Sequence, residues 1–362
     1  MKNLLLLVIF LLFSSLAIAQ PIVEWQRWYG GSTHDRATAV DQTNDGGYVV
    51  AGQARSTDGD VSGNHGETDF WVIKLSESGD ITWQKNLGGS DRDEAYSIQQ
   101  TTDGGYIVAG LSKSNDGDVS GNHGDKDAWV VKLDEAGNIV WQKSLGGSKD
   151  EGFGHIHQTA DGGYIAAGYS ESDDGDASHN HGSGDAWVVK LDIAGNIQWQ
   201  KCLGGSGIDI VWSVQENPNG GYILGGGTSS NDGQVSGNHG SFDYWVVKLD
   251  ETGQFEWQKC LGGSSSDNLL SIQQTYDGGY VLAGSSESND GDVSGNHGGN
   301  GDFWVVKLDE TGNLQWQKCL GGSNADLAYA MDKTSDGGYI IAGTSESNDG
   351  DATSNIMGLI DS

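Results

Sequence analysis

The sequence predicts an all-β protein, a six-bladed β-propeller, from three observations. One unit recurs along the chain, and its marker tryptophan is spaced by 58 residues four times and then by 59, at Trp25, Trp83, Trp141, Trp199, Trp257 and Trp316. Each unit holds four strand-like segments separated by turn signals. The last unit is incomplete, and its missing segment stands at the other end of the chain. Four-stranded antiparallel sheets with open edges stack radially as blades.

The four segments are clearest in the second unit. We expect strands there at residues 95–101, 105–110, 128–133 and 139–145. The first two flank the pair Asp103-Gly104, which is a strong hairpin signal because the central positions of such a turn take positive φ. The third is rich in β-branched and aromatic residues, and the fourth follows across a turn that contains Gly137. Each unit is therefore expected to form two consecutive hairpins.

The incomplete copy predicts how the ring closes. The sixth copy has the first two segments and a degenerate third around residues 355–360, whereas residues 22–31 read IVEWQRWYGG and match the fourth segment of the other copies. We therefore expect residues 22–31 to complete the sixth blade. The expected domain is residues 20–362, with blades at about 32–89, 90–147, 148–205, 206–263, 264–322, and 323–362 plus 22–31.

The N-terminal segment and the composition limit which functions the protein can have. Residues 1–19 carry Lys2, an apolar run and the triplet Ala17-Ile18-Ala19, the order of a secretory signal peptide. We expect a periplasmic or extracellular protein without membrane insertion, because no other stretch approaches the roughly 20 apolar residues of a membrane helix. The net charge of -32 repels phosphate backbones, which excludes nucleic acid as a partner. The acidic excess serves solubility or supplies oxygen ligands for calcium.

Three cysteines occupy one repeat position, at Cys202, Cys260 and Cys319. Three thiols cannot all pair, and equivalent positions in neighbouring units usually lie too far apart for a disulfide. We expect small buried thiols.

Two stretches, KLDEAGNIVWQK at residues 132–143 and KLDETGNLQWQK at residues 307–318, resemble the tryptophan-docking segment of the quinoprotein alcohol dehydrogenase-like propellers. The resemblance covers every full repeat and implies that the marker tryptophan packs between adjacent blades. It concerns a packing segment, so no quinone or nucleotide cofactor is expected. As a whole, the chain resembles exported repeat proteins of Bacteroidota. A second series of tryptophans, one in the third segment of each full repeat, is expected in the core, and an exposed role in sugar stacking is the alternative. These are Trp71, Trp129, Trp187, Trp245 and Trp304.

The long loop between the second and third segments is the main candidate metal site. It reads SNDGDVSGNHGDKD at residues 114–127, and alternating Asp and Asn oxygens around a Gly bend suit a hard cation such as calcium. Plain turn chemistry, with side chains bonded to backbone, is the alternative. The calcium candidates are Asp58, Asp60, Asn64, Asp69, Asp116, Asp118, Asn122, Asp127, Asp174, Asp176, Asn180, Asp185, Asp232, Asn238, Asp243, Asp290, Asp292, Asn296 and Asp302. Gln234 replaces one Asp, so the fourth loop should bind most weakly.

One histidine per loop is expected to cap it, because zinc would need several convergent ligands. These are His65, His123, His181, His239 and His297.

A second set of acids precedes the first segment of each unit: Asp35, Asp93, Glu151, Asp209, Asp267 and Asp326. If the first strand is innermost, these acids would surround the mouth of the central channel and could hold a cation or a polar ligand. Alternatively, each acid hydrogen-bonds the backbone of its own turn. Trp212, His155 and His157 break the repeat symmetry and are the other candidates for binding at the channel mouth.

Catalytic residues are not identified by the sequence, because no motif or carboxylate pair stands out among the repeats. We expect an exported binding or scaffold module for a glycan or a protein, monomeric and steadied by calcium. The alternative is a polysaccharide-active enzyme, an endoglucanase-like glycoside hydrolase, which requires two carboxylates about 5–5.5 Å or 6.5–9.5 Å apart. A purely structural disk that binds protein partners is the second alternative.

Overall fold

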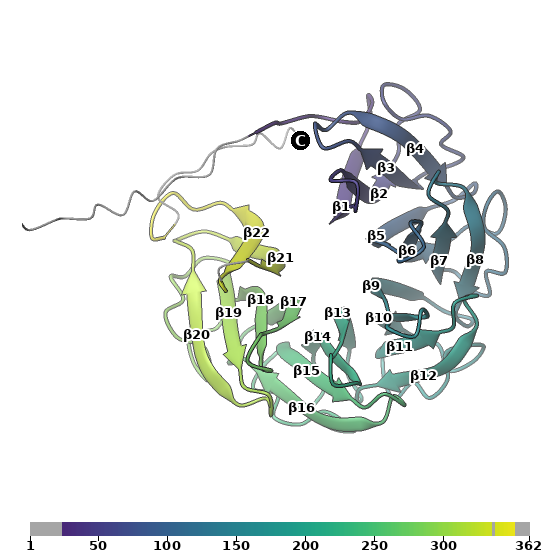
Figure 1. Ribbon diagram of the computed structural model, residues 1–362. Helices are drawn as coiled ribbons and strands as arrows, with labels where there is room; N and C mark the ends of the chain where they lie inside the picture. Colours follow the sequence, from purple (N-terminus) through teal and green to yellow (C-terminus); the bar gives the residue numbers. More distant parts are fainter. Residues whose placement is uncertain (1–23, 335–336, 352–362) are drawn as a thin grey trace, which may run out of the picture.

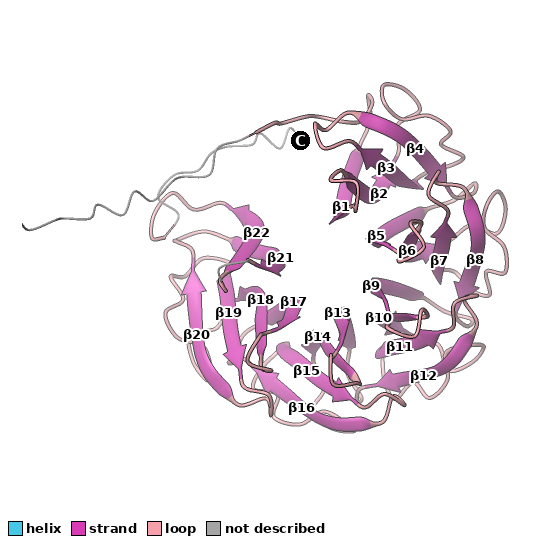
Figure 2. Cartoon of the chain, viewed as in Figure 1, coloured by secondary structure: helices cyan, strands magenta, loops and turns pink. Residues whose placement is uncertain are grey.

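The computed structural model describes residues 24–334 and 337–351, and β-strands form an open ring of blades with a gap between β22 and the first blade (Figure 1). Within these residues there are five four-stranded antiparallel sheets and one two-stranded sheet, with strands and loops but no helices (Figure 2). The predicted all-β propeller is confirmed. None of the described residues builds a helix of the length and apolarity needed to cross a membrane.

The blades follow one another along the chain. The first has β1 (Asp35–Gln42), β2 (Tyr48–Ala54), β3 (Asp69–Leu75) and β4 (Ile81–Leu87). The second has β5 (Asp93–Gln100), β6 (Tyr106–Ser112), β7 (Asp127–Leu133) and β8 (Ile139–Leu145). The third has β9 (Glu151–Gln158), β10 (Tyr164–Ser170), β11 (Asp185–Leu191) and β12 (Ile197–Leu203).

The fourth has β13 (Asp209–Glu216), β14 (Tyr222–Thr228), β15 (Asp243–Leu249) and β16 (Phe255–Leu261). The fifth has β17 (Asp267–Gln274), β18 (Tyr280–Ser286), β19 (Asp302–Leu308) and β20 (Leu314–Leu320). The last sheet has β21 (Asp326–Lys333) and β22 (Tyr339–Ser345). The first strand of every blade is innermost, and β4, β8, β12, β16 and β20 form the rim (Figure 1).

The tryptophans of the third strands are core residues. Trp129 is fully buried, and its Nε1 donates to Gln142 Oε1 on the next strand at 2.8 Å. The other four members of this series are exposed by 5% or less, which leaves no ring face for a sugar. The core assignment is confirmed.

The marker tryptophans join neighbouring blades. Trp83 in β4 packs edge-on against Tyr106 of the second blade, with ring centroids 5.6 Å apart. A Cβ on Gly137 would lie 2.9 Å from the Trp83 ring, so only glycine admits this contact. The same Trp–Tyr contact recurs at the next three interfaces. This confirms the docking role that the resemblance implied.

The three cysteines are free and buried, as expected. Burial, reinforced by neighbouring carboxylates, raises the pKa of each thiol to about 12. They act as small apolar side chains.

The two ends of the row of blades carry uncovered apolar faces. Val40 in β1 is 64% exposed, whereas its equivalent Ile98 is 6% exposed, and Ile340 in β22 is 63% exposed against 0% for Ile107. Residues 24–30 belong to no strand, yet Trp25 contacts Tyr48 at 5.8 Å in the manner of a docking tryptophan. The degenerate segment at 355–360 and the leader at 1–19 lie outside the described residues, so closure of the ring stays a prediction.

Candidate functional site on the loop-rich face

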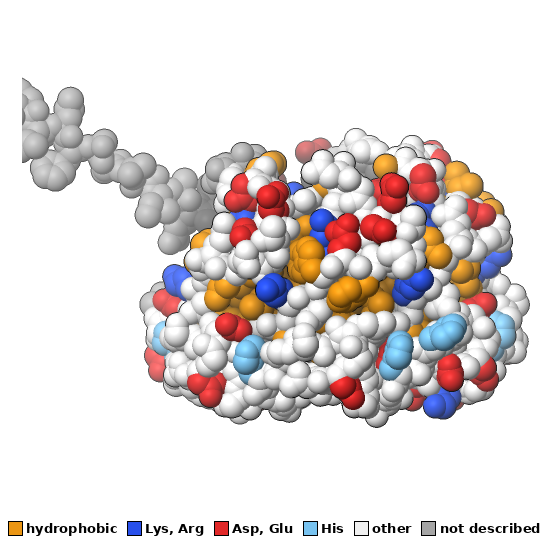
Figure 3. Space-filling model, turned by 90° about the horizontal axis from the view of Figure 1, so that it is seen from below, with side chains coloured by type: hydrophobic (Ala, Val, Ile, Leu, Met, Phe, Trp, Pro, Cys, Tyr) orange, Lys and Arg blue, Asp and Glu red, His pale blue; other side chains and the backbone are white. Residues whose placement is uncertain are grey.

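The long loops and the connections between blades lie on one face, which we call the loop-rich face. In the second blade, Asp116 of the β6–β7 loop accepts a hydrogen bond from Ser90 N at 2.7 Å, and Ser90 belongs to the β4–β5 connection. In a side view of the disk, histidine side chains are spread along its edge below the apolar band (Figure 3).

The calcium candidates of these loops are engaged with backbone groups. Asp118 Oδ2 accepts from Gly88 N at 3.3 Å, and Asn122 Nδ2 donates to Ser112 O at 3.1 Å. Gln234, the exception, accepts from Gly204 N at 2.9 Å through Oε1 and so makes the bond that Asp118 makes.

Residues 24–334 and 337–351 contain no group of three or more His, Cys, Asp or Glu side chains that could hold a metal. The hydrogen bonds of the loop residues match the alternative interpretation of plain turn chemistry. Oδ1 of Asp127 and of its equivalents in the other complete blades is, however, buried without a hydrogen-bond partner among the described residues, and calcium binding stays a prediction to be tested.

Each loop histidine pairs with a buried aspartate. His123 Nδ1 lies 2.7 Å from Asp127 Oδ2, which also accepts from His123 N at 3.1 Å. Asp127 is fully buried, and burial raises its pKa. The same His–Asp pair occurs in the other four complete blades. The histidine therefore closes the loop onto the start of the third strand.

The acids that begin the first strands lie inside the blades. Asp93 is fully buried and accepts hydrogen bonds from Gly89 N at 2.8 Å, Ser114 Oγ at 2.9 Å and Ser112 Oγ. The equivalents Glu151, Asp209, Asp267 and Asp326 are buried too, whereas Asp35 is half-buried. Each acid thus binds its own turn, as the alternative interpretation has it, and does not face the channel mouth.

His155 and His157, in β9, join blades. His155 Nδ1 accepts a hydrogen bond from Val214 N of the fourth blade at 3.4 Å. At the preceding interface, between the second and third blades, Ser97 Oγ accepts the equivalent bond from Ile156 N. Burial lowers the pKa of His155 to about 4, so its ring is neutral and can accept. His157 Nδ1 lies 3.2 Å from Gln99 Nε2 of the second blade.

Trp212 packs over Gly154 of the preceding blade. A Cβ on Gly154 would lie 2.8 Å from the Trp212 ring, so the indole fits at this position because Gly154 has no side chain. These two residues, like His155, lie at the interface of the third and fourth blades.

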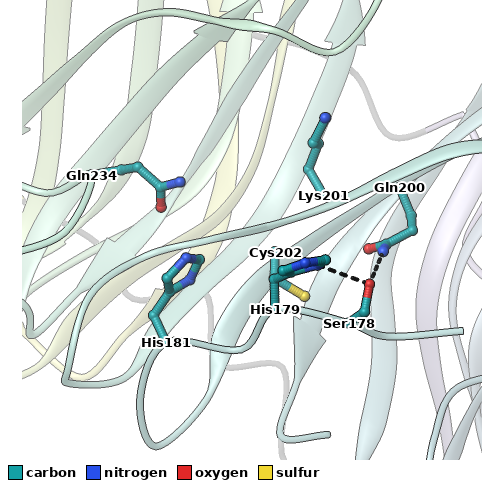
Figure 4. Close-up of a pocket in the computed structure, with 7 residues that line it drawn as sticks. All are labelled: Ser178, His179, His181, Gln200, Lys201, Cys202 and Gln234. Atoms are coloured by element: carbon teal, nitrogen blue, oxygen red, sulfur yellow. Dashed lines mark hydrogen bonds between the residues drawn. The ribbon is translucent and has the colours of Figure 1, made fainter. Parts of the chain in front are cut away.

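A cavity of about 390 Å³ lies on the loop-rich face between the third and fourth blades (Figure 4). Its lining comes from the β10–β11 loop, from β12 and from the β14–β15 loop: Ser178, His179, His181, Gln200, Lys201, Cys202 and Gln234. The cavity is widely open to solvent, and its volume lies at the lower end of the range of small-ligand sites.

Two residues that line the cavity, His179 and Gln234, differ from the residues at the equivalent positions of the other repeats. His179 has φ 72°, and it is the one non-glycine residue with positive φ among the described residues. The equivalent positions hold Gly63, Gly121, Gly237 and Gly295. The position of Gln234 holds aspartate in the other loops, at Asp60, Asp118, Asp176, Asp292 and Asp351. In the sequence the difference is visible as SHNHG in place of SGNHG, a single change that by itself indicates no role for His179, and the sequence predicts Gln234 only as a weakened calcium ligand.

No protein-family model matches the chain, and a sequence comparison with curated proteins finds no match. Solved β-propellers resemble it in fold alone. The WD40 domain of Pan2 from Neurospora crassa has 12% identity and a TM-score of 0.45, covering 84% of each chain. A protein of unknown function from Bacteroides caccae has 11% identity and a TM-score of 0.43, covering 80% of this chain and 83% of that one. BamB from Moraxella catarrhalis has 18% identity and a TM-score of 0.40, covering 81% and 70%.

Proposed function

We propose that the protein is an exported, non-catalytic binding module that takes a glycan or a protein ligand on its loop-rich face. A β-propeller is commonly a binding or scaffold module, but a fold assigns no ligand. The observation that carries the proposal is the cavity between the third and fourth blades, where His179 and Gln234 replace residues shared by the other loops.

The backbone of His179 supports this assignment. A non-glycine residue in the left-handed region costs about 1–2 kcal/mol, and such strain is concentrated at functional sites. Glycine fills this position in four other loops, so the loop itself does not require an imidazole.

The lining argues against hydrolysis at this cavity. A glycoside hydrolase needs two carboxylates, and the seven lining residues include none. The acids of the neighbouring turns are buried and hydrogen-bonded to their own turns, as Glu151 is to Gly147 N at 2.7 Å. Export rests on the signal-peptide pattern of residues 1–19.

A glycan array, a protein pull-down and a reducing-sugar assay on the mature chain test the proposal together. We expect binding of a glycan or a protein without release of sugar. Released sugar would replace the proposal with the hydrolase. If no glycan on the array is bound and the pull-down captures no protein, a binding role is refuted. The His179→Gly variant serves as a matched control, because it restores the residue of the other loops and should weaken binding.

A further inference from the structure

The free hydrogen-bonding groups of the cavity indicate the chemistry of its ligand, an inference that rests on the proposed function. On the third-blade side, Gln200 Oε1 accepts from Trp187 Nε1 at 3.1 Å. Since an indole nitrogen only donates, this bond fixes the amide, and Gln200 Nε2 donates to Ser178 Oγ at 2.7 Å.

Ser178 also contacts the imidazole of His179. Ser178 Oγ lies 3.0 Å from His179 Nδ1, and its single hydrogen is available to that nitrogen. In the tautomer in which Ser178 donates, the ring proton of His179 sits on Nε2, and a ligand that accepts from Nε2 selects this tautomer.

The fourth-blade side also presents a donor. Gln234 Oε1 is taken by Gly204 N at 2.9 Å, so its Nε2 amide group is the part left for a ligand. Figure 4 shows Gln234 across the cavity from the two imidazoles. At the other interfaces a carboxylate stands in place of this amide, for example Asp292, and would repel an anion.

Two carboxylates touch the histidines of the cavity, and each accepts from a histidine backbone N–H through one oxygen, while Oδ1 of Asp185 is buried without a hydrogen-bond partner among the described residues. Asp173 Oδ1 accepts from His179 N at 2.9 Å. Asp185 accepts from His181 N at 3.0 Å and faces His181 Nδ1. Lys201 also lines the cavity, with its amine directed away from the imidazoles (Figure 4). The lining thus presents donors from two blades and no lining carboxylate, on a chain whose overall net charge is -32.

We propose that this cavity binds a small anionic ligand through a carboxylate group, which accepts from His179 Nε2 and Gln234 Nε2. The carboxylate could belong to an acidic sugar or to a small organic acid, and both offer the same two acceptor oxygens. The exchange of one aspartate for glutamine and one glycine for histidine distinguishes this interface from the others, so one such site per chain is expected.

Protein-observed NMR titrations of the mature chain with glucuronate, glucose and acetate test the proposal. We expect glucuronate to shift amide signals of the β10–β11 and β14–β15 loops, and glucose to leave them in place. Acetate distinguishes the sources: shifts as strong as those of glucuronate assign a small organic acid, and weaker shifts assign an acidic sugar.

The variant His179→Gly with Gln234→Asp restores the residues of the other loops and should fold as they do. Loss of two hydrogen bonds to a charged group predicts glucuronate binding at least about tenfold weaker. The reverse variant, Gly237→His with Asp292→Gln, should gain a second set of shifting signals between the fourth and fifth blades.

Unchanged affinity in the restored variant, equal shifts with glucose, or no shift with any of the three probes would overturn the proposal. A neutral glycan or a protein bound on the loop-rich face would then leave the proposed function standing while this inference fails.

Discussion

The interface between the third and fourth blades differs from that between the fourth and fifth at both its inner and its outer edge. Near the channel, His155 Nδ1 accepts from Val214 N, whereas Ser213 Oγ accepts from Ile272 N at the later interface. At the rim, His179 and Gln234 stand where the later interface has glycine and aspartate. In the middle, the docking contact is the same: ring centroids lie 5.6 Å apart at Trp199–Tyr222 and 6.1 Å apart at Trp257–Tyr280.

The comparison separates bonds that hold the ring together from groups that are free to bind. His155 and Gln234 make the backbone bonds of the residues they replace, so the scaffold tolerates the exchange. His179, in contrast, adds a side chain where the other loops have none and places it at a cavity.

The largest expected effect tests whether the two interfaces contribute equally to the free energy of unfolding. Trp199→Ala and Trp257→Ala should each lower the free energy of unfolding by about 3 kcal/mol, since each removes a large aromatic packed between blades. Urea denaturation measures both. Trp28→Ala is the control, because Trp28 is 78% exposed and its removal should cost little. A much smaller loss at only one of the two interfaces would contradict equivalence.

The inner layer should respond to pH. The folded pKa of His155 is lowered to about 4 by burial, below its ordinary value of 6.5. Its contribution to stability is therefore fully present above pH 6.5 and is lost as the pH falls from there towards about 4. His155→Ser restores the residue of the neighbouring interfaces.

Unfolding free energies of the parent and of His155→Ser, measured at neutral and mildly acidic pH, give the comparison. We expect the parent to lose more stability on acidification. Parallel pH profiles would show that the imidazole does not have to stay neutral in the folded chain.

A smaller effect is expected at the rim. His179→Gly should raise the free energy of unfolding by about 1 kcal/mol, because glycine adopts positive φ without the Cβ penalty. Gly237→His, the matched change at the next interface, should lower it by a similar amount, since Gly237 has φ 86°. A loss of stability in His179→Gly would mean that the imidazole serves the fold.

The smallest effect concerns calcium, whose binding by the Asp-rich loops is still to be tested. Each candidate has a hydrogen bond to backbone, but Oδ1 of Asp127 and of its four equivalents is buried without a hydrogen-bond partner among the described residues. If the loops are plain turns, melting curves in millimolar calcium and in excess chelator should coincide. A ligand that binds only the folded chain raises the melting temperature. A clear rise with calcium would restore the metal interpretation of the Asp-rich loops.

Strand pattern and turn signals predicted the blades closely because alternation and DG turns are local properties. The expected strand at residues 95–101 is Asp93–Gln100, and the expected strand at 139–145 is Ile139–Leu145. The resemblance correctly implied the Trp83 contact between blades.

The site was harder to predict, because it depends on where side chains point and which groups already have partners. Asp93 was a candidate for the channel mouth, but two serine hydroxyls hold it inside the blade. His179 looked like any single change within a repeat until its φ and its place at a cavity were known.

The most direct test of the central claim compares glycan-array and pull-down signals of the parent chain with those of His179→Gly combined with Gln234→Asp. The account predicts that ligands retained by the parent are lost or strongly weakened in the variant, with unfolding still cooperative. Equal retention by both proteins would contradict the claim that the interface of the third and fourth blades is the binding site.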